Sequence, residues 1–208
     1  MNMKKQAKMI FLIIVAVFVL VITSVCVTIY CNNHQKTLSY DLKDFNSIVG
    51  ASGQITSNNA EEYGNCGENK YFLKDGIFVI RGAGSVDYEE IPIEAIKSDS
   101  ENGWLDIIDV VVVEEGISSL QRGTLSNMNM QTVILPDTIN TIEKNLFYDC
   151  ASLENLYIPT SVSHIESYAF QGCDKLNHIE WNEKTYTSIS DFYKDFEANG
   201  GTIGWEEF

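Results

Sequence analysis

The most regular pattern in the sequence is a set of apolar positions that recurs at steps of 22 and 23 residues. A single repeat of this length has too little apolar surface to fold alone. Stacked repeats instead share a continuous core, in which equivalent positions form ladders along the stack. The aligned positions are Val111, Val133 and Leu156, then Leu120, Ile142 and Ile165, then Leu125, Phe147 and Phe170, and then Met128, Cys150 and Cys173.

This period, with one short strand in each repeat, predicts a mainly β protein built as a short leucine-rich-repeat-like solenoid. We expect about three coils over residues 111–181. A fourth strand begins at Ile179, and the pattern stops after it.

The region before the repeats, residues 63–110, predicts an N-terminal hairpin that caps the stack. Two apolar runs, Tyr71–Leu73 and Ile77–Ile80, flank an Asp75-Gly76 pair. Alternating strands separated by an Asp-Gly turn are typical of a β-hairpin.

The region after the repeats, residues 182–208, predicts a second cap. A short helix from Ser188 to Asn199 would begin at a serine cap and end at Gly200-Gly201. Its apolar face would consist of Ile189, Phe192 and Phe196.

The motifs resemble those of the BspA-type leucine-rich repeat family of surface proteins. The clearest repeat runs from Ile158 to Leu176 and reads IPTSVSHIESYAFQGCDKL, and the hairpin region from Cys66 to Gly84 reads CGENKYFLKDGIFVIRGAG. The resemblance covers roughly residues 64–196. It implies attachment to host or neighbouring-cell proteins, or assembly at the bacterial surface.

The N-terminus predicts a membrane anchor. Residues 9–30 contain no charged residue, Gly or Pro, and Lys4, Lys5 and Lys8 precede them. As a helix this segment would span roughly 33 Å, which is enough to cross a bilayer. The lysines keep the N-terminus in the cytoplasm and place the remaining chain outside.

We therefore expect a cytoplasmic region over residues 1–8, a single-pass transmembrane anchor over 9–31 and an extracytoplasmic tether over 32–62. The tether would contain one short helix near Tyr40–Ile48. A cleaved signal peptide and a lipoprotein are the alternatives. The apolar run is long for a signal peptide, and Val25 and Tyr30 precede the two nearby cysteines where a lipoprotein signal would have a small residue.

The charge distribution excludes some partners. The chain carries 14 basic and 29 acidic residues, a formal net charge of −15, and no acid precedes Asp41. The part beyond the apolar run therefore lacks the basic footprint that nucleic acid or anionic lipid requires.

The residues that could carry chemistry form no recognisable motif. His34, His164 and His178 have no metal-ligand spacing, and no calcium loop or nucleophile elbow is present. Cys150 and Cys173 are one coil apart, so they could form a disulfide or a ladder of buried thiols; Met128 at the equivalent position favours the ladder. We expect Cys66 to be a free thiol. We predict no enzyme, no cofactor and no metal site.

The predicted function is protein recognition or adhesion at the cell surface, with a host, neighbouring-cell or envelope protein as partner. The alternatives are a structural subunit of an envelope membrane complex and an unrecognised envelope hydrolase. Strand residues alternate between core and solvent, and the outward positions form a strip with apolar and aromatic character. The candidate partner-binding residues are Val112, Thr132, Ile134, Asn155, Tyr157, His178 and Glu180, with Val110 on the same face. The same strip could instead be covered by the tether or reflect strand propensity alone.

Overall fold

The computed structural model describes residues 44–91 and 108–204. The predicted cytoplasmic region, the predicted anchor and the first part of the predicted tether lie outside these residues. Within the described ranges, no helix is long and apolar enough to cross a membrane. The elements are α2 (Phe45–Ser52), β1 (Glu62–Cys66), β2 (Asn69–Lys74), β3 (Ile77–Arg81), β4 (Gly84–Val86), a 3₁₀ turn (Tyr88–Glu90), β5 (Val110–Val113), β6 (Ile117–Leu120), β7 (Thr132–Ile134), β8 (Thr141–Ile142), β9 (Asn155–Tyr157), β10 (His164–Ile165), β11 (His178–Trp181), β12 (Lys184–Tyr186), α4 (Ile189–Ala198) and β13 (Thr202–Ile203).

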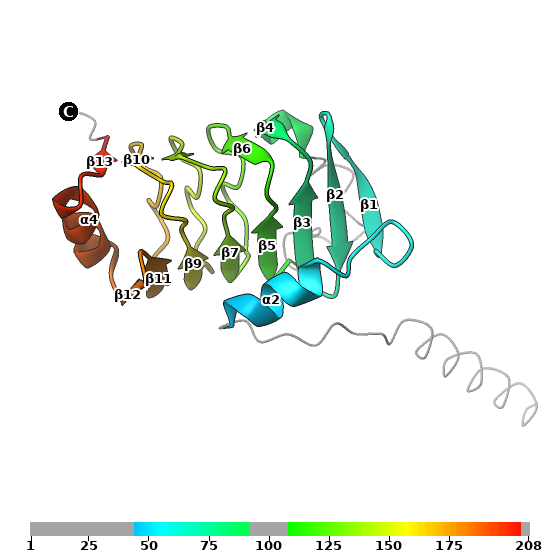
Figure 1. The fold of residues 1–208 in the computed structure, drawn as a ribbon, viewed down its shortest axis with the longest axis horizontal. Helices are drawn as coiled ribbons and strands as arrows, with labels where there is room; N and C mark the ends of the chain where they lie inside the picture. Colours follow the sequence, from blue (N-terminus) through cyan, green and yellow to red (C-terminus); the bar gives the residue numbers. More distant parts are fainter. Residues whose placement is uncertain (1–43, 92–107, 205–208) are drawn as a thin grey trace, which may run out of the picture. The chain divides into compact units, whose positions relative to one another are not determined.

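An eight-stranded sheet organises the fold, with the order β1-β2-β3-β5-β7-β9-β11-β12. The strands from β3 to β11 are parallel, and antiparallel pairs close both ends (Figure 1). Val111, Val133, Leu156 and Ile179 stand opposite one another in successive strands. This register confirms the alignment of the repeats.

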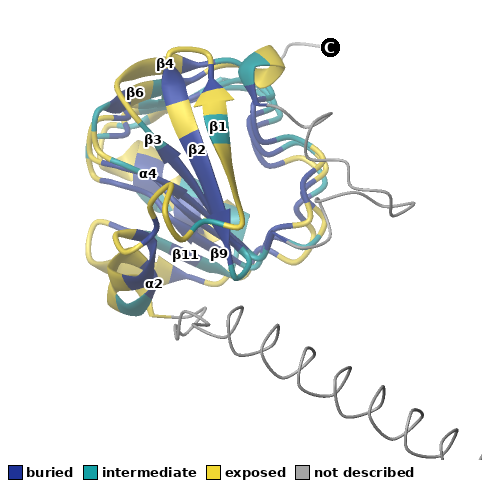
Figure 2. Ribbon diagram, turned by 90° about the vertical axis from the view of Figure 1, so that its right-hand side faces the viewer, coloured by how far each residue is buried: buried dark blue, intermediate teal, exposed yellow. Residues whose placement is uncertain are grey.

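The core lies between this sheet and short strands on the opposite side of each coil. β8, β10 and β13 form one small parallel sheet, and β4 pairs with β6 in another. The predicted ladder residues Leu120, Ile142 and Ile165 point inward there and are buried. Figure 2 shows most of the large sheet as buried.

Aromatic rings and thiols stack from coil to coil inside the core. The rings of Phe147 and Phe170 are nearly parallel, with centroids 5.6 Å apart. The Cys150 thiol donates a hydrogen bond to the Leu125 carbonyl at 3.1 Å, and the Cys173 thiol donates to the Phe147 carbonyl at 3.0 Å. Both cysteines are free, so the predicted thiol ladder is confirmed in preference to the disulfide.

The third described cysteine, Cys66, is also free and buried. Burial and the nearby Glu90 carboxylate raise the pKa of its thiol to about 11. The pKa of the Cys173 thiol is likewise raised, by its hydrogen bond with the Cys150 sulfur and by burial. These thiols remain protonated near neutral pH, which suits a packing role.

The N-terminal hairpin is confirmed, but it extends the sheet and does not lie across its end. Asp75 and Gly76 have φ values of 49° and 79°, as the tight Asp-Gly turn between β2 and β3 requires. β3 then pairs in parallel with β5, so the hairpin continues the same sheet. β1 adds a further antiparallel strand that we did not predict.

The C-terminal cap is also confirmed. Ser188 caps α4 by accepting a hydrogen bond from the Asp191 N–H, and Gly201 N–H closes the helix on the Phe196 carbonyl. Phe192 and Phe196 are fully buried and lie edge-on against Trp181 of β11. The helix therefore seals the last coil.

The predicted tether differs from the structure in its last part. The helix found there is α2, which begins at Phe45, about five residues after the predicted start, and ends at Ser52. Its side chains Ile48 and Ala51, and Ile55 just beyond it, are buried. The aromatic rings of Phe45 and Tyr157 of β9 lie 5.3 Å apart. This segment packs on the sheet and is not a free spacer.

We predict that Phe170→Ala lowers the free energy of unfolding by about 3–5 kcal/mol, as expected for truncating a buried aromatic side chain. Phe170 loses its stack on Phe147 and its contact with Tyr193 of α4. Chemical denaturation of the full chain measures the change. Gln171→Ala, at the exposed neighbouring position, should change the stability by no more than about 0.5 kcal/mol. A Phe170→Ala variant as stable as this control would contradict the ladder.

Candidate interaction surface

The structure brings the seven predicted binding residues together on the outer face of the sheet. Val112, Ile134, Tyr157 and Glu180 stand in one row across β5, β7, β9 and β11. Thr132, Asn155 and His178 form the neighbouring row. The alternation of inward and outward positions was therefore predicted with the right register.

The prediction that this strip is exposed is wrong for five of the seven residues. Val112, Thr132, Ile134, Asn155 and Tyr157 have at most 4 % of their surface exposed. The physical reason is that α2 lies across the outer face and covers it (Figure 1). His178 and Glu180, beyond the helix, keep partly exposed side chains.

The outer face forms a second apolar layer with α2. β2 and β3 contribute Phe72 and Val79, which stand in register with Val112, and both are buried. The helix supplies the opposing apolar side chains of Ile48 and Ala51. Burying an aliphatic side chain stabilises a fold by roughly 1.5–3 kcal/mol, so this layer contributes to folding as well as to shape.

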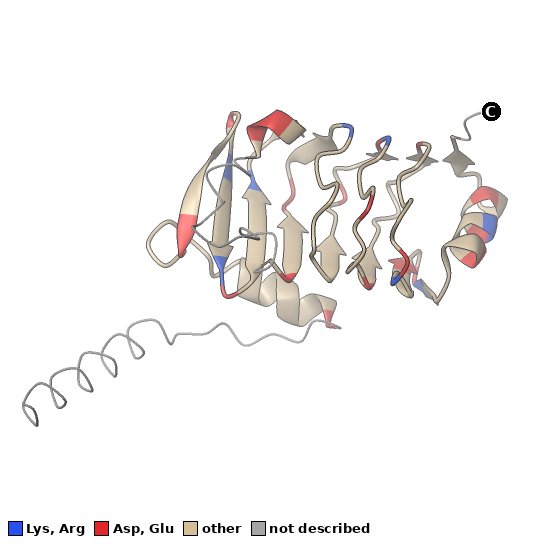
Figure 3. Cartoon of the chain, turned by 180° about the vertical axis from the view of Figure 1, so that it is seen from behind, with Lys and Arg blue, Asp and Glu red and all other residues tan. Residues whose placement is uncertain are grey.

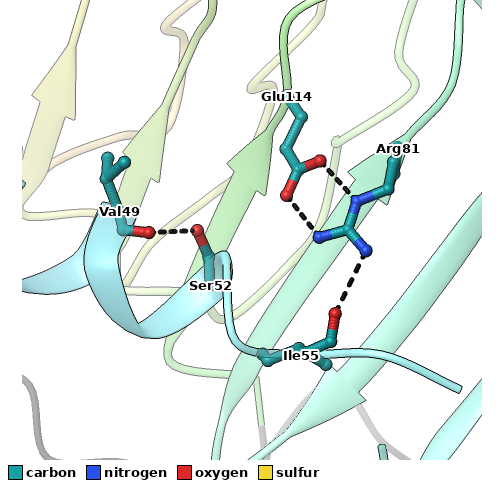
Figure 4. A network of polar contacts seen from close by, with 5 residues as sticks. All are labelled: Val49, Ser52, Ile55, Arg81 and Glu114. Atoms are coloured by element: carbon teal, nitrogen blue, oxygen red, sulfur yellow. Dashed lines mark hydrogen bonds and ion pairs between the residues drawn. The ribbon is translucent and has the colours of Figure 1, made fainter. Parts of the chain in front are cut away.

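One arginine fixes the chain at the end of α2. The Arg81 guanidinium donates two hydrogen bonds to Glu114, from Nε at 2.5 Å and from Nη2 at 2.6 Å, and its Nη1 donates to the Ile55 carbonyl at 3.1 Å (Figure 4). The guanidinium carbon also lies 4.8 Å from the centre of the Phe72 ring. The hydrogen bonds to Glu114 raise the pKa of Arg81. Arg81 thus links β3, the residue that follows β5 and the segment after α2.

Thr132 and Asn155, two buried polar residues of the outer face, form a hydrogen bond with each other. The Asn155 side chain donates a hydrogen bond to the Thr132 hydroxyl at 3.0 Å. A buried polar group without a partner costs about 1–3 kcal/mol, so this pair allows the face to be closed without that penalty.

The uncovered end of the outer face borders a groove of about 500 Å³. Phe45 at the start of α2 forms one wall, and the β11–β12 turn with Asn182 and Glu183 forms the other. Tyr157 and Glu180, two of the predicted residues, also line it. Sequence reasoning missed Phe45, Asp137 and Glu183 because they lie in the predicted tether and in turns, where the repeat pattern carries no signal.

Two pairs of oppositely charged or titratable side chains lie at this end of the sheet. His178 Nε2 lies 3.0 Å from a Glu180 carboxylate oxygen, and Lys184 Nζ pairs with Asp195 of α4 at 2.8 Å. Across residues 44–91 and 108–204, no group of three or more His, Cys, Asp or Glu side chains is placed to hold a metal ion.

Comparisons with known proteins agree with the repeat architecture. Residues 105–197 match the family described as "BspA type Leucine rich repeat region (6 copies)". No curated protein matches the chain.

Two solved structures are similar to the chain. A leucine-rich cell surface protein of Faecalibacterium prausnitzii is 19 % identical, with a TM-score of 0.36, and the match covers 65 % of this chain and 42 % of that protein. A leucine-rich repeat protein of Eubacterium ventriosum is 20 % identical, with a TM-score of 0.29, and covers 61 % and 46 %. The chain thus spans less than half the length of either structure. The repeat register and the ladders agree with the family match: residues 105–197 of the chain match a BspA-type leucine-rich repeat region.

Proposed function

We propose that this protein is a non-catalytic recognition module that is anchored in the cell membrane and binds a protein partner outside the cytoplasm. The BspA-type repeat array is the observation that carries the proposal, because the BspA-type family that these repeats resemble consists of surface proteins. Repeat solenoids present a regular surface that suits binding to other macromolecules.

The sequence before the described residues supports the proposed location. An uncharged stretch of 22 residues follows three lysines, and this arrangement favours a single span with a cytoplasmic N-terminus. Fourteen residues lie between that stretch and α2. The repeat array would therefore act close to the membrane surface.

The covered outer face restricts where a partner can bind. Val112, Thr132, Ile134 and Asn155 are buried on the face that α2 crosses, so a partner cannot reach them while the helix is in place. His178, Glu180 and the groove beside Tyr157 stay accessible at the end of the same face. We place partner recognition at this end.

The first test of the proposal is topology. A protease added to intact cells that produce the full chain should digest the repeat array, while a tag before Met1 stays protected and membrane-bound. Cleavage of the apolar segment would contradict the anchor, and it would be seen as a mature N-terminus near residues 25–35 by terminal sequencing.

The second test is contact with a partner. A photo-cross-linking residue is placed in the full chain at Asn182 beside the groove, at Ser118 on the opposite side of a coil, or at Asn199 after α4; all three positions are exposed. Irradiation of intact cells should yield one dominant cross-linked protein. Absence of a protein adduct from all three positions would contradict a recognition role, whereas an adduct from Ser118 or Asn199 alone would keep the role and move the site.

A further inference from the structure

The groove at the end of the outer face combines an aromatic wall with three acidic residues. Phe45 keeps 40 % of its surface exposed and rests against Tyr157, at a centroid distance of 5.3 Å. Asp137, Glu180 and Glu183 line the same groove, which therefore offers one apolar side and three carboxylates.

Within residues 44–91 and 108–204, no lysine or arginine is paired with these three carboxylates. Among the described residues, Asp137 and Glu183 make no hydrogen bond or ion pair through their carboxylates, and Glu180 contacts only His178. Lys184, the basic residue among the described lining residues, is paired with Asp195 on α4. Figure 3 shows acidic positions outnumbering basic ones at this end of the sheet.

An arginine side chain matches this combination. Its planar guanidinium stacks on aromatic rings and donates paired hydrogen bonds to carboxylates, and it is more weakly hydrated than the lysine ammonium. The same face already holds an arginine in this manner: Arg81 lies over the Phe72 ring and pairs with Glu114 through two hydrogen bonds. A partner arginine in the groove would repeat this arrangement between Phe45 and the acidic rim.

We propose that the groove between Phe45 and the β11–β12 turn binds an arginine side chain flanked by apolar residues in a protein partner. This inference rests on the proposed recognition function and names the chemistry of its site. The apolar neighbours of the arginine contact the aromatic wall, and the carboxylates of Asp137 and Glu183 receive the guanidinium.

The test uses the full chain in detergent micelles and three fluorescently labelled pentapeptides, which carry arginine, citrulline or glutamate between two leucines. Citrulline keeps the shape of arginine but removes its charge. Fluorescence anisotropy should show binding of the arginine peptide at least about tenfold tighter than that of the citrulline peptide, because a charged hydrogen-bonded pair contributes roughly a tenfold factor. The glutamate peptide should not bind.

A matched pair of variants locates the effect. The double variant Asp137→Asn and Glu183→Gln should weaken binding of the arginine peptide about tenfold. The control double variant Asp174→Asn and Glu68→Gln removes the same charge from exposed positions outside the groove and should change binding less than about twofold.

Three results would overturn the inference. The first is equal affinity for the arginine and citrulline peptides, and the second is no binding of the arginine peptide at millimolar concentration. The third is equal weakening of binding by the groove and control variants, which would mean that the peptide is attracted to the acidic protein in general. None of them would affect the cross-linking test, so failure at the groove is distinguishable from failure of the recognition role.

Discussion

The outer face of the sheet must be shielded from water, and most features of this protein depend on that constraint. β5 consists of four consecutive valines, so it presents apolar side chains on both faces. Parallel strands of this kind are normally buried on both sides. The coils of the solenoid cover the inner face. On the other face, α2 covers the sheet, and Arg81 donates a hydrogen bond to the Ile55 carbonyl in the segment that follows the helix.

Most of the fold could be predicted from the sequence, because equivalent positions in successive repeats indicate which residues of neighbouring strands stand opposite one another. The equivalence of Val111, Val133 and Leu156 fixed three strands, and turn and cap residues identified the hairpin and α4. α2 was displaced in the prediction because it is a single short helix in polar sequence, with few buried side chains. No repeat or strong periodicity marks where it packs.

The candidate site was predicted with the right residues on the right face, yet with the wrong exposure. The alternation rule identifies which side chains point away from the core, but it does not say whether another segment covers them. One signal was available: Val110 and Val112 continue the apolar run on the outward side, where a solvated face would carry polar residues. The turn residues Asp137 and Glu183 had no such signal, since only the folded chain brings them to one groove.

The closed outer face is tested most directly by measuring how fast a newly introduced cysteine reacts. The background is the full chain with Cys26→Ser and Cys31→Ser, in which the three remaining native cysteines, Cys66, Cys150 and Cys173, are buried. A water-soluble maleimide is added to native protein with a new cysteine, either Ile134→Cys under α2 or Glu180→Cys at the uncovered end. The account predicts labelling at position 134 at least about tenfold slower than at position 180, because it requires local opening of the helix. Equal rates at the two positions would show an open face and contradict the account.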